Sequence, residues 1–310
     1  MDGAESSDSA DLLVICGPTG AGKSAIAMAL AESRDVAIIS ADSRQIYRGF
    51  DIGTAKPTDA ERERVPHFGV DVVEPTERYS AASWAAGATE WIKGARATGR
   101  VPLIVGGTGF YIRSLVEPLF TEPPLDQQRL TALREKIAPM PTAELRRWVK
   151  RLDPARSHLG RAQLARAVEV AMLTGTALSA WHARAPGAPR RSARYLVVDP
   201  GSSLRSRIET RLHDMMRAGW EEEVAALDAG IPDDAPAWNA SGYRAMRDLV
   251  RGKVSRAEAI DRAFVDTRQY AKRQRTWFRH QLPSGSVTKV DPAAPDNLDV
   301  ARRWLESGGE

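Results

Sequence analysis

Residues 17 to 24 read Gly17-Pro18-Thr19-Gly20-Ala21-Gly22-Lys23-Ser24 and directly follow an apolar run, Leu12 to Cys16. This octapeptide matches the pattern G-x-x-x-x-G-K-[S/T] at every fixed position. A buried strand, a glycine-rich turn and a helix beginning near Gly22 form an anion site, because loop N–H groups and a helix N-terminus face the ligand. Lys23 adds a positive charge, and the hydroxyl of Ser24 can bind Mg²⁺. The sequence therefore predicts that residues 17 to 24 bind a diphosphate or a nucleotide, as in ATP-binding proteins.

Short apolar runs elsewhere are typical of further buried parallel strands. They are Val36 to Ser40, Val101 to Val105 and Tyr195 to Val198, with a weaker candidate at Val70 to Val73. Helical patterns alternate with them or follow them, at Ala81 to Ala97, Leu204 to Ala218, Glu221 to Ala229, Gly242 to Val250 and Arg256 to Gln281. We therefore expect an α/β fold whose core is a P-loop NTPase-like parallel sheet.

The stretch from Pro118 to Arg194 has no convincing strand pattern and contains helical patterns. We interpret it as a helical insertion that leaves the sheet domain and returns to it. The expected organisation is a catalytic core at 11–121 and 195–290, a helical basic insertion at 122–194, and tails at 1–10 and 291–310. The second tail is expected to be mostly polar, with a short helix at 298–305.

Positive charge is concentrated in this insertion. The 310 residues carry a net charge of +4, yet residues 129 to 194 contain 14 Lys and Arg against four Asp and Glu, or +10. A second basic run extends from Arg262 to His280. Clustered cations of this kind favour a polyanionic partner.

Composition also excludes several classes of protein. The single cysteine, Cys16, excludes an intramolecular disulfide and a multi-cysteine metal site. No apolar run is long enough to span a membrane, and the acidic start of the chain does not resemble a signal peptide. We therefore expect a soluble, cytoplasmic protein with no membrane partner.

The aspartate that holds Mg²⁺ in ordinary P-loop NTPases is not where that class would place it. The run Val101 to Val105 leads into Gly106-Gly107-Thr108, and there is no Asn-Lys-x-Asp signal for guanine. Instead, the run Val36 to Ser40 delivers Asp42 to the sheet edge where Lys23 is expected. From residue type alone, Asp42 could act as a base, a metal ligand or a helix cap.

Several motifs in the chain together resemble the tRNA dimethylallyltransferases. They are Ala41-Asp42-Ser43-Arg44-Gln45-Ile46-Tyr47, Asp51-Ile52-Gly53-Thr54-Ala55-Lys56-Pro57, Pro66-His67, Val105-Gly106-Gly107-Thr108-Gly109-Phe110-Tyr111, and Thr267 to Arg279. The resemblance extends in order from about Leu12 to His280. It implies transfer of a dimethylallyl group from its diphosphate to the exocyclic amine of the adenosine just 3′ of the anticodon, in a compact monomer of the bacterial type.

The resemblance also implies roles for residues. Asp42 would be the general base, Thr108 would position the reacting atoms, and Lys23, with Mg²⁺ on Ser24, would stabilise the leaving diphosphate. Arg244 is a weaker candidate for a contact with the diphosphate or with tRNA. The implied tRNA contacts are Asp42, Ser43, Arg44, Gln45, Thr108, Arg129, Gln163, Arg166, Arg268, Lys272, Arg275 and Arg279.

Four of these contacts share one face of a helix, because Arg268, Lys272, Arg275 and Arg279 follow the spacing i, i+4, i+7, i+11. The aromatic residues among them, Tyr270, Trp277 and Phe278, are expected to pack on the core rather than to stack on bases. The insertion departs from the family pattern, since His158-Leu159-Gly160-Arg161 stands where His-Pro-Asn-Asp is usual.

Three other functions fit the phosphate loop. A P-loop kinase of small molecules would turn over ATP and have no use for a basic insertion. A prenyltransferase acting on free adenine nucleotides would not need tRNA. An RNA-binding protein without catalytic activity would tolerate loss of Asp42.

Overall fold

The computed structural model describes residues 11–117, 123–184 and 191–307. The chain divides into two compact units, one formed by Met1–Glu117 with Arg190–Glu310 and the other by Pro118–Pro189. None of the helices within these described ranges combines the length and the apolar character needed to cross a membrane.

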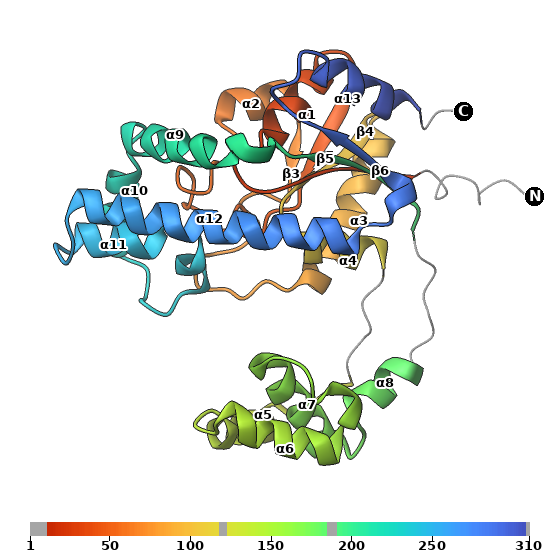
Figure 1. Ribbon diagram of the computed structural model, residues 1–310, viewed down its shortest axis with the longest axis vertical. Coiled ribbons are helices and arrows are strands. Elements are labelled where there is room, and N and C mark those ends of the chain that lie inside the picture. The colour runs from red at the N-terminus through yellow and green to blue at the C-terminus, as the bar shows by residue number, and fades with distance from the viewer. Residues whose placement is uncertain (1–10, 118–122, 185–190, 308–310) are drawn as a thin grey trace, which may run out of the picture. The chain divides into compact units, whose positions relative to one another are not determined.

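The first unit is built on a parallel sheet of six strands in the order β3-β2-β4-β1-β5-β6 (Figure 1). The strands are β1 Leu12–Cys16, β2 Val36–Ser40, β3 His67–Phe68, β4 Val101–Gly106, β5 Ala193–Val198 and β6 Val287–Val290. Cys16 pairs with Gly106, and Ser40 pairs with Val105, so β1, β2 and β4 end at the same edge. Ligands of open parallel sheets bind at this carboxyl edge.

Helices cover both faces of the sheet (Figure 1). On one face lie α1 Lys23–Ala31 and α13 Asn297–Glu306, and their apolar side chains join the main core. On the other face lie α3 Ala81–Ala97 and α4 Gly109–Val116. The short α2 is Asp59–Arg64, started by a capping box at Thr58.

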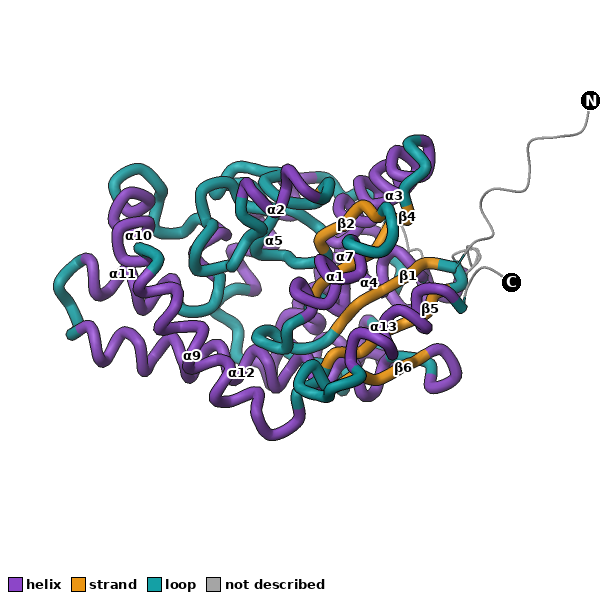
Figure 2. Tube along the Cα trace, turned by 90° about the horizontal axis from the view of Figure 1, so that it is seen from above, coloured by secondary structure: helices purple, strands orange, loops and turns teal. Residues whose placement is uncertain are grey.

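Four helices gather beside the sheet (Figure 2). They are α9 Leu204–Arg217, α10 Trp220–Asp228, α11 Tyr243–Val250 and α12 Arg256–Gln281. The long helix α12 packs against α9, α11 and α4, and its buried positions are Ala259, Ala263, Ala271, Gln274 and Phe278. A buried glutamine among alanines is unusual, and its partners are described below.

The second unit is helical in its described residues. It contains α5 Gln127–Ile137, α6 Thr142–Leu152, α7 Arg161–Thr174 and α8 Leu178–Arg184. Its own core includes Ile137, Leu145, Val149, Leu164 and Val168.

Three sequence-based expectations about the fold need correction. The strand expected at Val70 to Val73 is wrong, because the edge strand β3 is His67–Phe68 and Val73 makes only an isolated bridge with Tyr47. The boundary expected between residues 194 and 195 falls inside β5. The expectation that 291–310 is a mostly polar tail is wrong at α13, where Trp304 and Leu305 are buried. The helix expected near 298–305 is confirmed.

The start of the insertion, placed between residues 121 and 122, and the tail at 1–10 lie outside the described residues. The edge strand β6 was not predicted.

Candidate active site

The phosphate loop connects β1 to α1, as its sequence predicts. Gly17 has φ of +145°, and a Cβ there would lie 2.2 Å from the carbonyl oxygen of Val198, so only glycine fits. The first backbone bond of the α1 ladder joins the N–H of Ile26 to the oxygen of Gly22 (3.2 Å). The N–H groups of Lys23 and Ser24 therefore precede that ladder and can bind an anion.

Lys23 interacts electrostatically with two other charged side chains of this site. Its Nζ donates a hydrogen bond to the carbonyl oxygen of Pro18 (2.9 Å). Burial lowers the pKa of Lys23 to about 8; the nearby carboxylate of Asp42 opposes this shift and Arg211 adds to it. The three side chains are thus electrostatically coupled before any ligand binds.

Asp42 lies at the carboxyl end of β2, in a tight turn. Its Oδ1 accepts a hydrogen bond from the backbone N–H of Arg44 (2.8 Å). Thr108, at the carboxyl end of β4, is tied to the same turn: its N–H bonds to Ala41 (3.0 Å), and its Oγ1 accepts from the N–H of Ser43 (3.0 Å). Two adjacent strand ends therefore hold Asp42 and Thr108 in one rigid unit.

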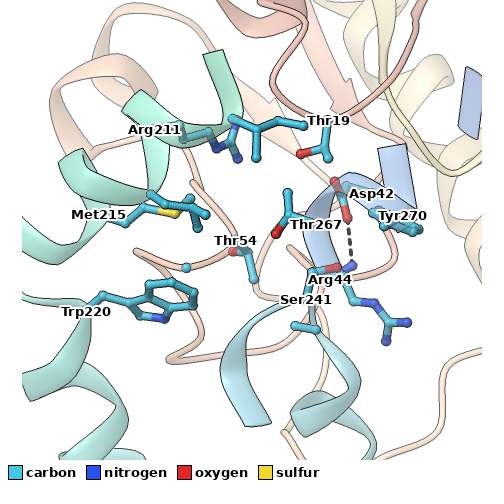
Figure 3. A pocket seen from close by; sticks show the side chains of 14 residues that line it. Thr19, Asp42, Arg44, Thr54, Arg211, Met215, Trp220, Ser241, Thr267 and Tyr270 are labelled. Atoms are coloured by element: carbon cyan, nitrogen blue, oxygen red, sulfur yellow. Dashed lines mark hydrogen bonds between the residues drawn. The ribbon is translucent and has the colours of Figure 1, made fainter. Parts of the chain in front are cut away.

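One pocket is lined both by Asp42 and by Thr19 of the phosphate loop (Figure 3). Its polar lining residues are Thr19, Asp42, Arg44, Thr54, Arg211, Ser241, Thr267 and Tyr270. Its larger apolar lining residues are Ile208, Leu212, Met215 and Trp220. Met215 and Trp220 lie at the end away from Asp42 and Tyr270 (Figure 3). The pocket thus combines a charged end with an apolar end.

Two titratable residues that line this pocket, Arg211 and Tyr270, were not predicted as site residues. Arg211 comes from α9, and burial lowers its pKa while the carboxylate of Asp42 partly offsets the shift. The sequence feature that could have identified Arg211 is its position seven residues after Leu204, which places a charged residue on the apolar face of the helix.

Tyr270 was expected to pack on the core. Instead it lines the pocket, with its phenol next to Thr108 and Ser43. Burial raises the pKa of the Tyr270 phenol and the charge of Asp42 adds to the rise, so the phenol is neutral at ordinary pH. Phe278 is buried as predicted.

The motif from Asp51 to Pro57 forms one wall of the pocket through Gly53 and Thr54. Glu223, on α10, holds this wall by accepting hydrogen bonds from the backbone N–H groups of Asp51 (3.0 Å) and Ile52 (2.6 Å). Its other oxygen accepts from the hydroxyl of Tyr243 (2.6 Å). The wall is therefore fixed to the helices beside the sheet.

Some predicted residues lie elsewhere. Arg244 donates to the side-chain oxygen of Asn239 and lines a different pocket, between α11 and α12. The amide of Gln45 is occupied by the carbonyl oxygen of Ala55 (2.9 Å) and by the hydroxyl of Ser40 (2.7 Å). The structure thus brings Asp42, Thr108 and the phosphate loop together, but it does not bring Arg244 to them.

The predicted basic contacts divide into two groups. Arg129, Arg268, Lys272 and Arg279 are exposed on their helices, as is Gln163. Arg275 instead pairs with Asp199 (2.5 Å), and Arg166 pairs with Glu169 (2.7 Å). Both arginines are thus engaged within their own units.

The IPP transferase family profile matches residues 45–281, and that of isopentenyl transferases matches residues 10–67. The chain belongs to the tRNA dimethylallyltransferase (IPP transferase) family. The enzyme is 42% identical to a tRNA dimethylallyltransferase of Thermosynechococcus vestitus, over 87% of each chain. It is also 42% identical to one from Halorhodospira halophila, over 91% of this chain and 94% of the relative.

Solved structures agree with this assignment. The enzyme resembles the full-length tRNA isopentenylpyrophosphate transferase of Bacillus halodurans, with a TM-score of 0.69 and 31% identity over 96% of each chain. It also resembles a eukaryotic dimethylallyltransferase solved acting on tRNA, with a TM-score of 0.78 and 26% identity over 91% of this chain and 74% of that one.

Proposed function

We propose that this tRNA dimethylallyltransferase moves the dimethylallyl group of dimethylallyl diphosphate to the exocyclic amine of the adenosine 3′ of the anticodon. One observation carries the proposal: Thr19 of the phosphate loop and Asp42, which is hydrogen-bonded into the same turn as Thr108, line the same pocket. A donor that carries a diphosphate and an acceptor that must lose a proton can meet there.

The donor would be held at both of its ends. The N–H groups at the start of α1, Lys23 and Arg211 surround the position of the diphosphate with positive charge. The apolar end of the pocket, which includes Met215 and Trp220, suits a five-carbon hydrocarbon chain.

The acceptor amine is a weak nucleophile, because its lone pair is conjugated with the adenine ring. In the reaction the amine nitrogen forms a bond to C1 of the dimethylallyl group, and the bond from C1 to the diphosphate oxygen breaks. The electron pair of that bond leaves with the diphosphate, whose charge Lys23 and Arg211 stabilise. The proton of the amine passes to Asp42, a contribution worth about 10²–10⁴-fold in rate.

Thr108 and its neighbours would orient the acceptor. Its Oγ1 is fixed by the N–H of Ser43, and Tyr270 contacts both residues. The adenosine must leave the stack of the anticodon loop to reach Asp42, as the substrates of other base-modifying enzymes do.

Mg²⁺ fits the donor site, although the residues that the structure describes include no cluster of three or more His, Cys, Asp or Glu able to hold a metal. Mg²⁺ is commonly held by one or two protein oxygens and by the phosphates of the substrate. The exposed hydroxyl of Ser24, at the second residue of α1, is such an oxygen. When bound there, the ion would neutralise part of the charge of the leaving diphosphate.

The tRNA would contact the exposed basic residues of the insertion and of α12, with Arg129, Arg268, Lys272 and Arg279 making phosphate contacts that position the anticodon stem-loop. Arg166 and Arg275 would have to exchange their carboxylate partners for phosphates to join them. We also propose that the enzyme is cytoplasmic. We further propose that it acts as a monomer, since one chain supplies the residues that would bind the donor and those that would bind the acceptor.

A labelling experiment tests the function. Purified enzyme is incubated with labelled dimethylallyl diphosphate, Mg²⁺ and unmodified tRNA, with AMP and ATP as parallel acceptors. Label in tRNA at the adenosine 3′ of the anticodon is the expected result. Label in the free nucleotides alone would support the nucleotide prenyltransferase, and ATP hydrolysis without label transfer would support the kinase.

A further inference from the structure

Gln274 is a buried polar side chain for which the reaction as described has no role. It lies on α12 and is only 5% exposed, among the buried residues Ala271 and Phe278. Burying a primary amide costs free energy unless its donor and acceptor groups find partners. The identity of those partners therefore indicates what the residue does.

Both partners belong to loops of the active site. The Gln274 Oε1 accepts a hydrogen bond from the backbone N–H of Thr19 (2.8 Å), in the phosphate loop. Its Nε2 donates to the carbonyl oxygen of Gly107 (2.9 Å), in the loop that follows β4. One side chain thus joins the loop that binds the donor to the loop that carries Thr108.

The contact with Gly107 is close. A Cβ on Gly107 would lie 2.2 Å from the Nε2 of Gln274, so a side chain at residue 107 would displace the amide. Glycine at this position therefore allows α12 to approach the backbone.

The hydrogen-bonded connection made by Gln274 extends from Gly107 to Asp42, the proposed general base. Thr108 follows Gly107, and it is hydrogen-bonded to the backbone of Ala41 and Ser43 on either side of Asp42. A continuous path of hydrogen bonds and short backbone segments thus runs from Thr19 through Gln274 and Thr108 to Asp42.

We propose that Gln274 is a positioning residue that sets the separation between the diphosphate donor and the Asp42–Thr108 unit. The proposal rests on the function proposed above, because it concerns the distance between the two substrates of that reaction. The attacking nitrogen and C1 must be held close and aligned, and a displacement of about 1 Å can lower the rate about 100-fold. Gln274 is not among the residues that line the pocket, so it would act through the two loops.

The first variant is Gln274→Met, which keeps the length of the side chain and removes both hydrogen bonds. We expect kcat to fall roughly 10- to 100-fold, while KM for dimethylallyl diphosphate and for tRNA changes less than about threefold. Gln269→Met is the matched control, because Gln269 is exposed on the same helix, and it should leave kcat unchanged.

The second variant is Gln274→Glu, which separates positioning from general destabilisation. A neutral carboxyl can restore both bonds, since its carbonyl oxygen can accept from Thr19 and its hydroxyl can donate to Gly107. Burial raises the pKa of a carboxyl. The kcat of Gln274→Glu, divided by that of the unaltered enzyme at the same pH, should therefore rise as the pH falls. The ratio for Gln274→Met should stay flat. Taking the ratio removes the titration of Lys23 and of any other group that the two enzymes share.

The kinetic results for the two Gln274 variants decide whether this residue positions the two loops. A higher KM for dimethylallyl diphosphate with unchanged kcat, or a kcat ratio for Gln274→Glu that does not depend on pH, would overturn the proposal. If Gln274→Met does not fold, Gln274→Glu at low pH still tests it. Absence of label transfer to tRNA by the unaltered enzyme would instead overturn the proposed function, and the positioning role with it.

Discussion

The ammonium group of Lys56 lies 2.5 Å from a carboxylate oxygen of Asp71, and only 2% of the Lys56 side chain is exposed. A second carboxylate, that of Asp51, lies at 2.5 Å on another side, and the carbonyl oxygen of Tyr47 completes the set of acceptors. Lys56 thus fastens the pocket wall that contains Gly53 and Thr54 to the segment after β3.

Replacing Lys56 tests how firmly that wall is held. Lys56→Met should lower the free energy of unfolding by about 2–3 kcal/mol, because it leaves the acidic partners without their buried cation. Lys93→Met is the control: its pair with Glu90 is 67% and 70% exposed, so the loss should stay below about 0.5 kcal/mol. Urea denaturation measures both, and equal losses would contradict the role given to Lys56.

Replacing Asp42, the proposed general base, isolates proton transfer. Asp42→Asn keeps an oxygen that can accept from the N–H of Arg44, so the turn should persist. We expect kcat to fall about 10²–10⁴-fold, with little change in KM for dimethylallyl diphosphate. Single-turnover label transfer measures this, and an active Asp42→Asn enzyme would exclude Asp42 as the base.

The two candidate arginines should behave differently. Arg211→Met should lower kcat/KM for dimethylallyl diphosphate roughly 10- to 100-fold, the loss expected for a charged hydrogen bond. Arg244→Met should leave it nearly unchanged, because Arg244 bonds to Asn239 outside the pocket. Steady-state kinetics decide the matter, and the opposite ranking would restore the assignment made from the sequence.

The affinity for diphosphate should depend on pH through Lys23. With its pKa at about 8, the free enzyme holds Lys23 neutral at higher pH, whereas the bound anion favours the charged form. Above pH 8 binding must take up a proton, so Kd for inorganic diphosphate should rise up to about tenfold per pH unit. Calorimetry in buffers of different ionisation enthalpy detects that proton, and Lys23→Met should bind more weakly with a flatter pH dependence.

The stability of the free enzyme should show the opposite trend. The pKa of Lys23 is lower in the folded state than its ordinary value of 10.5, so folding disfavours the charged form. This penalty is complete below about pH 8 and disappears as the pH rises to 10.5. Thermal unfolding of the unaltered enzyme and of Lys23→Met, compared between pH 7 and 10, measures the difference.

The basic face of α12 should contribute to tRNA binding unevenly. Lys272→Ala should reduce the slope of log affinity against log salt by about 0.7–0.9, the effect of one lost phosphate contact. Arg275→Ala should change that slope less and lower the melting temperature instead, because Arg275 is paired with Asp199 and bonds to the carbonyl oxygen of Gly201 (2.9 Å). Equal changes of slope would show that Arg275 leaves Asp199 for the RNA.

The sequence predicted the parts of the fold whose signals are local. The phosphate loop, β2, α3 and α12 follow from apolar runs and helical spacing within single segments. The edge strands β3 and β6 were misplaced or missed, because they have two and four residues and are not continuous apolar runs. The apolar residues of the last helix, α13, stand among polar residues in the sequence. Their burial depends on packing against α1, which is distant in the chain.

The same contrast holds for the site. Asp42 and Thr108 follow from motifs that end two strands, but Arg211 and Gln274 reach the site from helices far along the chain. Gln274 lies 255 positions after Thr19, so no spacing in the sequence relates them. The position of Arg244 outside the pocket was not foreseen, because a motif gives a residue's neighbours in sequence and not the direction of its side chain.

The strand order has a consequence for synthesis on the ribosome. Strand β1 pairs with β4 on one side and with β5 on the other, and the entire helical insertion separates β4 from β5 in the chain. The nascent chain therefore carries β1 with one unpaired edge until the insertion has been translated. An unpaired edge favours intermolecular pairing. Because the insertion has a core of its own, it can fold before β5, the fifth strand in the chain, has been translated.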